Sequence, residues 1–239
     1  MSGLFASWEN RALEASVPPA DSALVAKGLT FAYADTTVIS DVNIAVRSGD
    51  IVAIMGPSGS GKSTLLHLLA GLFVPGRGQV WHGSTRVDSL GNRARAKQRL
   101  ANVGFVFQFG DLIPELNVVE NTEFPLRLQG MRPGLARQRA MAMLDSLGLA
   151  SLAKKRLFEV SGGQAQLVAV ARSVVHQPGL VLADEPTGAL NTQDGELVLE
   201  ALLRVAQDHG AAVVVVTHAM RVAAWADRDI QLLDGRRVE

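Results

Sequence analysis

The sequence predicts an α/β protein with a mainly parallel sheet, and three observations support this prediction. Short apolar runs typical of strands alternate with segments whose apolar residues recur at helical spacing. Hydrophobic residues make up 48% of the chain and aromatic residues only 5%, so the core must consist of Val, Leu, Ile and Ala, as in sheets covered on both faces. A glycine-rich segment also lies directly between an apolar run at residues 51–55 and a helical pattern.

Composition and charge exclude several classes of protein. The 239 residues include 23 basic and 23 acidic side chains, which give a formal net charge of zero, and we therefore expect no nucleic-acid partner. The sequence contains no cysteine, which excludes disulfides, thiolate metal sites and cysteine nucleophiles. We expect no cleaved signal peptide at the N-terminus. No uncharged stretch approaches the ~20 residues that span a bilayer, so we expect a cytoplasmic chain without direct membrane insertion.

The first part of the chain changes character near residue 23. Residues 1–22 contain small and polar residues, a Pro18–Pro19 pair and no sustained periodicity, so we expect a flexible leader. A helix with Leu65 and Leu69 on its apolar face should precede Pro75. Turn residues separate the other expected elements, which are strands at 29–33, 37–39, 42–46, 51–55, 79–81 and 103–107 and a polar helix at 92–100.

The second part begins with a helical stretch at residues 111–155. Asn117 is followed three residues later by Glu120, which predicts a capped helix start, and a second helix is expected at 135–147. Strands should return at 180–183 and 211–216 with a helix at 196–207 between them, and Asp234–Gly235 predicts a hairpin turn. The predicted architecture is therefore a strand–helix–strand core with a helical insertion near its middle.

Residues 56–63 match the phosphate-binding pattern G-x-x-x-x-G-K-[ST] in the required context, after a buried strand and before a helix. Glycines let successive backbone N–H groups point at phosphate oxygens, and the helix beginning near Lys62 adds the positive end of its dipole. We expect Lys62 to reach the β- and γ-phosphates of a nucleotide and Ser63 to ligate Mg²⁺. The predicted nucleotide-binding residues of this loop are Gly56, Pro57, Ser58, Gly59, Ser60, Gly61, Lys62, Ser63 and Thr64.

The phosphate-binding loop alone is typical of kinases, GTPases and ATPases. A second motif is needed to decide between these classes of nucleotide-binding protein. Four apolar residues at 180–183 lead to Asp184 and Glu185. A strand of this kind delivers Asp184 to the metal site at the carboxyl edge of the sheet, and Glu185 is suited to orient or deprotonate a water. The guanine-specific pattern N-K-x-D is absent, which argues against a GTPase.

Val160, Ser161, Gly162, Gly163 and Gln164 lie between those two motifs, and with them the chain resembles the ATP-binding cassette (ABC) ATPases. Ser161 can cap the following helix, which leaves the backbone N–H groups of Gly162 and Gly163 open to an anion. In the family, that anion is the γ-phosphate of ATP held by the opposite subunit. The resemblance implies a second ATP-binding subunit, in a homodimer around two ATP.

The resemblance spans about residues 24–239 and implies further assignments. It implies a P-loop NTPase cassette at 23–239 with a RecA-like core sheet, an N-terminal antiparallel β subdomain and an α-helical subdomain at about 109–167. Gln108 resembles the glutamine that senses Mg²⁺ and the attacking water, His218 the switch histidine that contacts the γ-phosphate, and Tyr33 the aromatic residue that stacks on adenine. The implied catalytic residues are Glu185, His218, Lys62 and Gln108, and the implied Mg²⁺ ligands are Ser63, Gln108 and Asp184.

The chain departs from the family pattern at two positions. Leu167 stands where an arginine often follows the signature glutamine, and Asn191 stands where an aspartate is expected. Neither change removes a phosphate contact or the base, so we still expect catalysis, and Leu167 is expected to pack against the insertion.

Residues 104–108, 112–121 and 183–188 resemble the lipoprotein-release and macrolide-export (MacB-like) type of the family. This type implies an ATPase at the cytoplasmic face of the membrane that drives a separate permease, which exports or extracts a hydrophobic or peptide-like cargo such as haem, an antibiotic or a lipoprotein. Phe109, Leu112, Ile113 and Leu116 are expected to line the groove that receives the permease. The alternatives are the ATPase of an amino-acid importer and a soluble ABC ATPase without a transport role.

Overall fold

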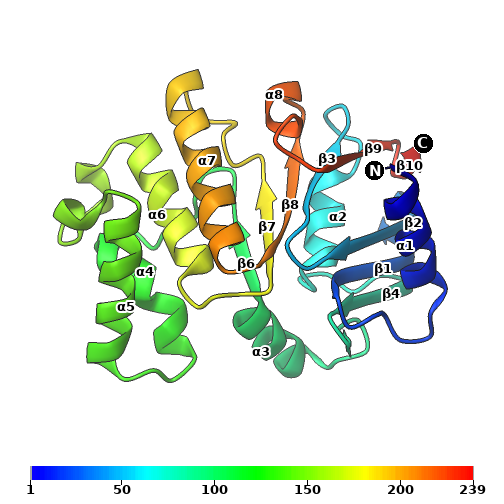
Figure 1. Cartoon of the computed structure of the whole chain (residues 1–239), viewed down its shortest axis with the longest axis horizontal. Helices are drawn as coiled ribbons and strands as arrows, with labels where there is room; N and C mark the ends of the chain where they lie inside the picture. The colour runs from blue at the N-terminus through cyan, green and yellow to red at the C-terminus, as the bar shows by residue number, and fades with distance from the viewer. Residues whose placement is uncertain (1, 239) are drawn as a thin grey trace.

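The computed structural model describes residues 2–238, which form two β-sheets flanked by helices (Figure 1). A four-stranded antiparallel sheet has the strand order β2-β1-β4-β5. Its strands are β1 (Ser22–Tyr33), β2 (Thr36–Arg47), β4 (Arg77–His82) and β5 (Thr85–Arg86). This sheet confirms the predicted antiparallel β subdomain.

The second sheet has six strands in the order β10-β9-β3-β8-β7-β6. All neighbouring pairs are parallel except the hairpin of β9 and β10. The strands are β3 (Ile51–Met55), β6 (Val103–Val106), β7 (Leu180–Asp184), β8 (Ala212–Thr217), β9 (Arg228–Leu233) and β10 (Arg236–Val238). The mainly parallel core sheet predicted from the Val- and Leu-rich runs is therefore confirmed.

Alternate residues of the central strands face opposite layers, which is why their sequences are apolar throughout. In β8, Val214 and Val216 pack with α2 (Lys62–Leu69) and the antiparallel sheet. Val213 and Val215 instead pack with α6 (Gly162–Val174) and α7 (Thr192–Asp208). Every residue of β3 is buried, so the loop that follows β3 starts from a rigid support.

The helices of the predicted insertion gather at the end of the molecule away from the antiparallel sheet (Figure 1). Here α4 (Val118–Leu128) and α5 (Pro133–Ser146) pack against α6 around a third apolar cluster. Further helical elements are α3 (Asn92–Asn102), η1 (Ala150–Leu152), η2 (Leu157–Glu159) and α8 (Met220–Ala223). Within residues 2–238, no helix is both long and apolar enough to cross a bilayer.

Local capping signals in the sequence fix two helix starts. The Asn117 side chain accepts the backbone N–H of Glu120 at 2.9 Å, and the Glu120 carboxylate accepts the N–H of Asn117 at 2.9 Å, so the predicted cap of α4 is confirmed. Helix α7 begins earlier than expected, because the Asn191 side chain accepts the N–H of Asp194 at 2.9 Å and caps it.

The N-terminal segment differs from the expectation of a flexible leader. Residues Ser2–Glu14 form helix α1, and Trp8 and Ala12 are buried with Val25 and Ala45 of the antiparallel sheet. Leu4, Trp8 and Ala12 recur four residues apart, which is a helical spacing, but the periodic stretch is short. One large aromatic side chain and a buried glutamate anchor the helix, and such contacts depend on the partner surface as well as on local pattern.

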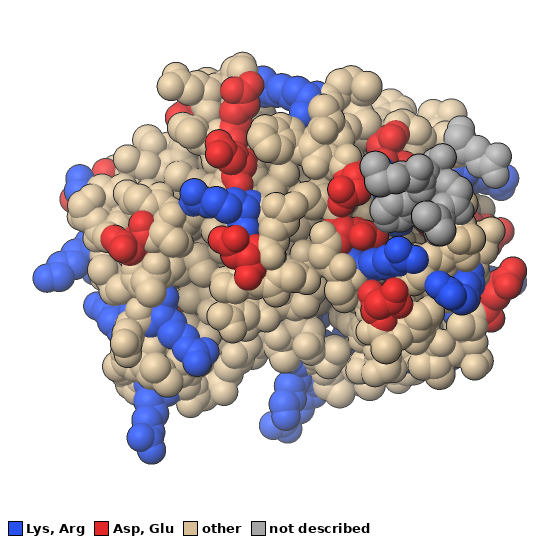
Figure 2. All heavy atoms as spheres, in the orientation of Figure 1, with Lys and Arg blue, Asp and Glu red and all other residues tan. Residues whose placement is uncertain are grey.

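Charges of both signs are distributed over the surface. On the face in Figure 2, acidic and basic side chains are interspersed over the upper part, and several Lys and Arg side chains project from the lower edge. This distribution accompanies the zero net charge of the sequence.

Candidate nucleotide-binding site

The loop at residues 56–63 connects β3 to α2 and forms one wall of a surface cavity of about 570 Å³. In this structure the Lys62 ammonium donates hydrogen bonds to the carbonyl oxygens of Gly56, at 2.9 Å, and Pro57, at 2.7 Å. The loop therefore curls around the lysine. The cavity is lined by Val38, Ser58, Gly59, Gly61, Lys62, Ser63, Thr64, Gln108, Glu185 and His218.

Two glycines of this loop are required by close approach and by backbone angle. A Cβ at Gly56 would lie 2.1 Å from the carbonyl oxygen of Leu232 in β9, so no larger residue fits there. Gly61, directly before α2, has φ of +96°, and a Cβ there would lie 2.9 Å from the carbonyl oxygen of Val38. These contacts explain why the glycines occur at these positions of the motif.

Asp184 ends β7 and faces the start of α2. The Ser63 hydroxyl donates a hydrogen bond to the Asp184 carboxylate at 3.1 Å. Burial raises the pKa of Asp184, against the opposing effect of the Ser63 hydrogen bond. A desolvated carboxylate beside a serine hydroxyl is a donor set suited to a small divalent cation.

Glu185 and His218 meet at the mouth of the cavity. The His218 Nδ1 and Glu185 Oε1 atoms lie 2.7 Å apart, which allows the imidazole to donate to the carboxylate. Glu185 has a left-handed φ of 44°, and its N–H donates to the carbonyl oxygen of Val216 at 2.9 Å. The strained backbone and this anchor turn the carboxylate from the end of β7 toward the cavity.

Gln108 follows β6 and lines the same cavity. Two residues of α6 hold the backbone around it. The buried Gln166 donates to the carbonyl oxygen of Phe107 at 3.0 Å, and Arg172 donates to those of Gly110 and Asp111, each at 2.7 Å. Sequence reasoning missed Gln166 and Arg172; the available signal was two long polar side chains that interrupt the apolar residues of α6 after its capped start.

Residues Ser161, Gly162, Gly163 and Gln164 begin α6 and lie outside the cavity lining. The Ser161 hydroxyl accepts the N–H of Gln164 at 3.2 Å, and the Gln164 side chain accepts the N–H of Ser161 at 3.0 Å. The predicted cap is therefore confirmed. Gly163 packs against α7, since a Cβ there would lie 2.9 Å from the Asp194 side chain.

Tyr33 lies beside the cavity rather than within its lining. Its ring is 48% exposed and makes edge contacts with Phe31 and Phe73, at centroid distances of 5.0 and 6.0 Å. The Tyr33 hydroxyl is 3.4 Å from the Thr64 Oγ1 atom. The structure thus leaves one part of the ring free beside the loop at 56–63.

The structure shows the contacts of Asn191 and Leu167, the two residues that depart from the family pattern. Asn191 caps α7 and also donates from its side-chain amide to the Asp194 carboxylate at 2.9 Å. Leu167 is partly buried between the core cluster of α7 and the cluster of α4 and α5, which agrees with the expectation that it packs against the helical insertion.

The structure brings one of the four residues expected to line a permease groove into an apolar groove. This groove, of about 480 Å³, lies between α3, α4 and the segment after β6, and Ile113 lines it. Phe109 is 76% exposed outside the groove, and Leu112 packs into the cluster of α4, α5 and α6. The apolar character of the run therefore arises partly from the core. The other apolar residues that line the groove include Leu72, Leu100, Phe105, Phe107, Phe124 and Leu128.

Comparisons with known proteins agree with this geometry. A family model described as ABC transporter matches residues 39–188. The chain is 42% identical to a lipoprotein-releasing system ATP-binding protein LolD from Pseudomonas fluorescens, over 84% of this chain and 88% of that protein. It is 41% identical to the LolD protein of Legionella pneumophila, over 90% and 96% of the two chains.

Solved structures give the same result for the fold. A dimeric structure of the bacterial ABC transporter cassette MJ0796 matches with a TM-score of 0.83 and 37% identity, over 90% of this chain and 97% of that chain. A second MJ0796 dimer, described as a post-hydrolysis state bound to ADP and Pi, also has a TM-score of 0.83, with 36% identity over the same shares of the two chains.

Proposed function

The chain belongs to the ABC transporter family, and from this premise we propose that two identical copies bind two ATP molecules between them and drive a permease that releases lipoproteins from the membrane. Membership makes the chain the ATP-binding subunit, which hydrolyses ATP in a dimer and works with a membrane permease. The identity of the two copies, the residue roles, Mg²⁺ and the cargo are the proposed parts.

The observation that supports the dimer is the separation of the two nucleotide motifs. Lys62, Ser63, Gln108, Glu185 and His218 converge on one cavity, whereas the capped start of α6 lies outside it. The N–H groups at that helix start suit a phosphate, but residues 161–164 do not line this cavity. A second copy that presents its own Ser161 to Gln164 segment would complete the site.

We assign the chemical roles within the cavity as follows. Lys62 releases its two carbonyl partners and donates to the β- and γ-phosphates, where a charge-assisted hydrogen bond is roughly twice as strong as a neutral one. Glu185 orients and deprotonates the attacking water, and His218 holds the carboxylate in position while it contacts the γ-phosphate. Tyr33 stacks on the adenine from the side of Thr64.

The residues present fit a Mg²⁺ ion. Ser63 and Asp184 offer oxygen atoms 3.1 Å apart, and partial burial of the Asp184 carboxylate raises its pKa, which a nearby cation would lower. We propose that Ser63, Asp184 and Gln108 hold Mg²⁺ together with the phosphates, as is usual for this ion. The bound ion supplies positive charge that stabilises the phosphate oxygens.

The apolar groove beside Gln108 is the proposed attachment point of the permease, and the chain then acts at the cytoplasmic face of the membrane. Gln166 and Arg172 connect the wall of this groove to the backbone around Gln108. Both relatives named above are lipoprotein-releasing system proteins, which supports lipoprotein release over an amino-acid importer.

The test is reconstitution of the chain with the membrane protein encoded beside it. ATP should drive release of a labelled lipoprotein from proteoliposomes to a soluble acceptor protein, and a Lys62→Ala chain should bind the permease without releasing cargo. Stimulation of ATP hydrolysis by a free amino acid and its binding protein, without lipoprotein release, would contradict the proposed cargo.

A further inference from the structure

Helix α1 is fixed to the antiparallel sheet by one aromatic anchor. Trp8 is 2% exposed and packs with Val25 and Ala45. Its indole N–H donates to the Asp21 carboxylate at 3.1 Å, and the Arg47 guanidinium lies over its ring at 4.4 Å. These contacts hold the helix on β1 and β2.

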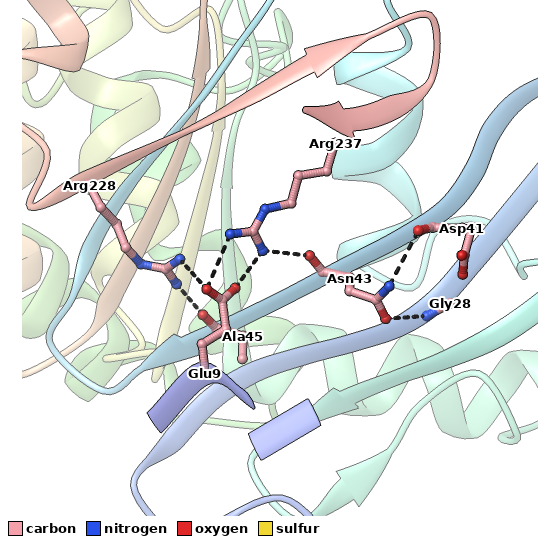
Figure 3. A network of polar contacts seen from close by, with 7 residues as sticks. All are labelled: Glu9, Gly28, Asp41, Asn43, Ala45, Arg228 and Arg237. Carbon is pink, nitrogen blue, oxygen red and sulfur yellow. Dashed lines mark hydrogen bonds and ion pairs between the residues drawn. The ribbon is translucent and has the colours of Figure 1, made fainter. Parts of the chain in front are cut away.

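The next residue, Glu9, points toward the C-terminal hairpin of β9 and β10 (Figure 3). Arg237 of β10 makes two hydrogen bonds to the Glu9 carboxylate, at 2.7 and 3.2 Å, and Arg228 of β9 makes a third at 3.3 Å. Glu9 is only 9% exposed. One buried carboxylate from the N-terminus therefore neutralises an arginine from each strand of the hairpin.

The same two arginines also contact β2. Arg237 donates to the carbonyl oxygen of Asn43 at 3.0 Å, and Arg228 donates to that of Ala45. Figure 3 shows the two guanidinium groups on either side of the Glu9 carboxylate, each also bonded to a carbonyl oxygen of β2. Because β10 is an edge strand whose three residues are all exposed, these polar contacts are a main restraint on its position.

The turn of this hairpin supports the loop at residues 56–63. The N–H of Gly235 donates to the carbonyl oxygen of Ser60 at 3.0 Å, and the carbonyl oxygen of Gly235 accepts the N–H of Ser40 at 2.8 Å. Two residues before Asp234 of this turn, the carbonyl oxygen of Leu232 packs closely against Gly56. A shift of the hairpin would therefore move the backbone at two positions of the phosphate-binding loop.

We infer that Glu9 is a positioning residue for ATP binding, which acts through Arg237 and the hairpin turn on the phosphate-binding loop. This inference rests on the proposed binding of ATP at that loop. Helix α1 then contributes to nucleotide affinity from the far side of the hairpin, in addition to its contribution to the stability of the fold.

The expected effect follows from the population of the correctly shaped loop. Glu9→Gln leaves Arg228 and Arg237 without their anionic partner, and β10 with fewer restraints. If the fraction of chains with a binding-competent loop falls to about one fifth, the apparent Kd for ATP rises about 5-fold. Bound ATP selects the same loop shape, so kcat should stay constant while KM rises.

The experiment compares three variants of the full chain in ATP binding and steady-state hydrolysis, well below the lowest Tm of the set. Glu9→Gln and Arg237→Gln should each raise Kd and KM about 5-fold. The double variant should raise them no further, because both changes remove the same ion pair between Glu9 and Arg237. Trp8→Phe is the control, because Trp8 lies on the same helix as Glu9. This change removes the hydrogen bond from Trp8 to Asp21 and removes no hydrogen bond to the hairpin.

Trp8→Phe should lower Tm and leave Kd unchanged. Glu9→Gln with a lowered Tm and the Kd of the unaltered chain would overturn the inference and reduce α1 to a stabilising helix. Effects of Glu9→Gln and Arg237→Gln that multiply in the double variant would also overturn it. Failure of the unaltered chain to bind ATP would overturn the proposed function together with this inference. An unchanged Kd in Glu9→Gln would overturn the inference alone, so the two failures can be distinguished.

Discussion

Replacement of Glu185 by Gln tests the assignment of the catalytic base. The Glu185 side chain is 16% exposed and its Oε1 atom lies 2.7 Å from the His218 Nδ1 atom. Glutamine has the same shape, and its amide oxygen can still accept the imidazole proton. The substitution therefore keeps the packing around Asp184 and removes only the group that takes up a proton from water.

The magnitude follows from that loss. Removal of a positioned general base lowers a rate by roughly 10²–10⁴-fold, which corresponds to about 2.7–5.4 kcal/mol in activation free energy. ATP binding should be unchanged, because we assign the phosphate contacts to the loop at 56–63 and to α2 rather than to this carboxylate.

The assay is phosphate release under single-turnover and steady-state conditions, with equilibrium ATP binding measured on the same preparations. Lys62→Ala serves as the control, since loss of the ammonium should impair both binding and hydrolysis. A Glu185→Gln chain that hydrolyses ATP at the rate of the unaltered chain would refute the assignment and indicate another base.

Three further predictions concern other parts of the molecule. Gly56→Ala should cost roughly 1–3 kcal/mol in unfolding free energy and weaken ATP binding, because the Cβ would lie 2.1 Å from the Leu232 carbonyl oxygen; denaturant unfolding with an unchanged midpoint would contradict this. Desolvation is the largest single effect on the pKa of Glu9 and raises it, but the Arg237 hydrogen bond and the charges of both arginines together outweigh desolvation, so the pKa is lowered. The ionised Glu9 carboxylate therefore stabilises the fold fully above its unfolded pKa of ~4.3. This stabilisation is lost as pH falls through the lower pKa of the folded state. Thermal melts should accordingly show a smaller acid-induced decrease in Tm for Glu9→Gln, and equal decreases would count against the ion pairs. Leu128→Glu, at a 57% exposed groove position, should reduce co-purification with the permease while ATP binding persists, whereas full co-purification would move the attachment site elsewhere.

Local signals in the sequence were sufficient for the sheet and for most of the site. The motif at 56–63 is determined by nearby residues, because a buried strand, close-packed glycines and a helix start are adjacent in the chain. The caps by Asn117 and Ser161 depend on a partner three residues away. Such short-range interactions leave a pattern that can be recognised before the fold is known.

Long-range contacts left no comparable pattern. Helix α1 depends on Glu9 meeting Arg228 and Arg237, more than 200 positions away, and no spacing rule connects these residues. The apolar run after Gln108 was divided between two places for a related reason, because long-range packing decides which side chains it buries. Ile113 lines the apolar groove, whereas Leu112 packs against the core of α4, α5 and α6. The roles of Gln166 and Arg172 depend likewise on the segment that packs against α6.

The central claim is that two copies of this chain close around ATP, with the phosphate-binding loop of one copy facing the capped start of α6 in the other. Its most direct measurement is the molar mass of the Glu185→Gln chain in solution by light scattering, with and without ATP. The account predicts a change on ATP addition from the monomer mass of 25.4 kDa to twice that value, and no change when Lys62→Ala is also present. A Glu185→Gln chain that is saturated with ATP and stays at the monomer mass would contradict the account.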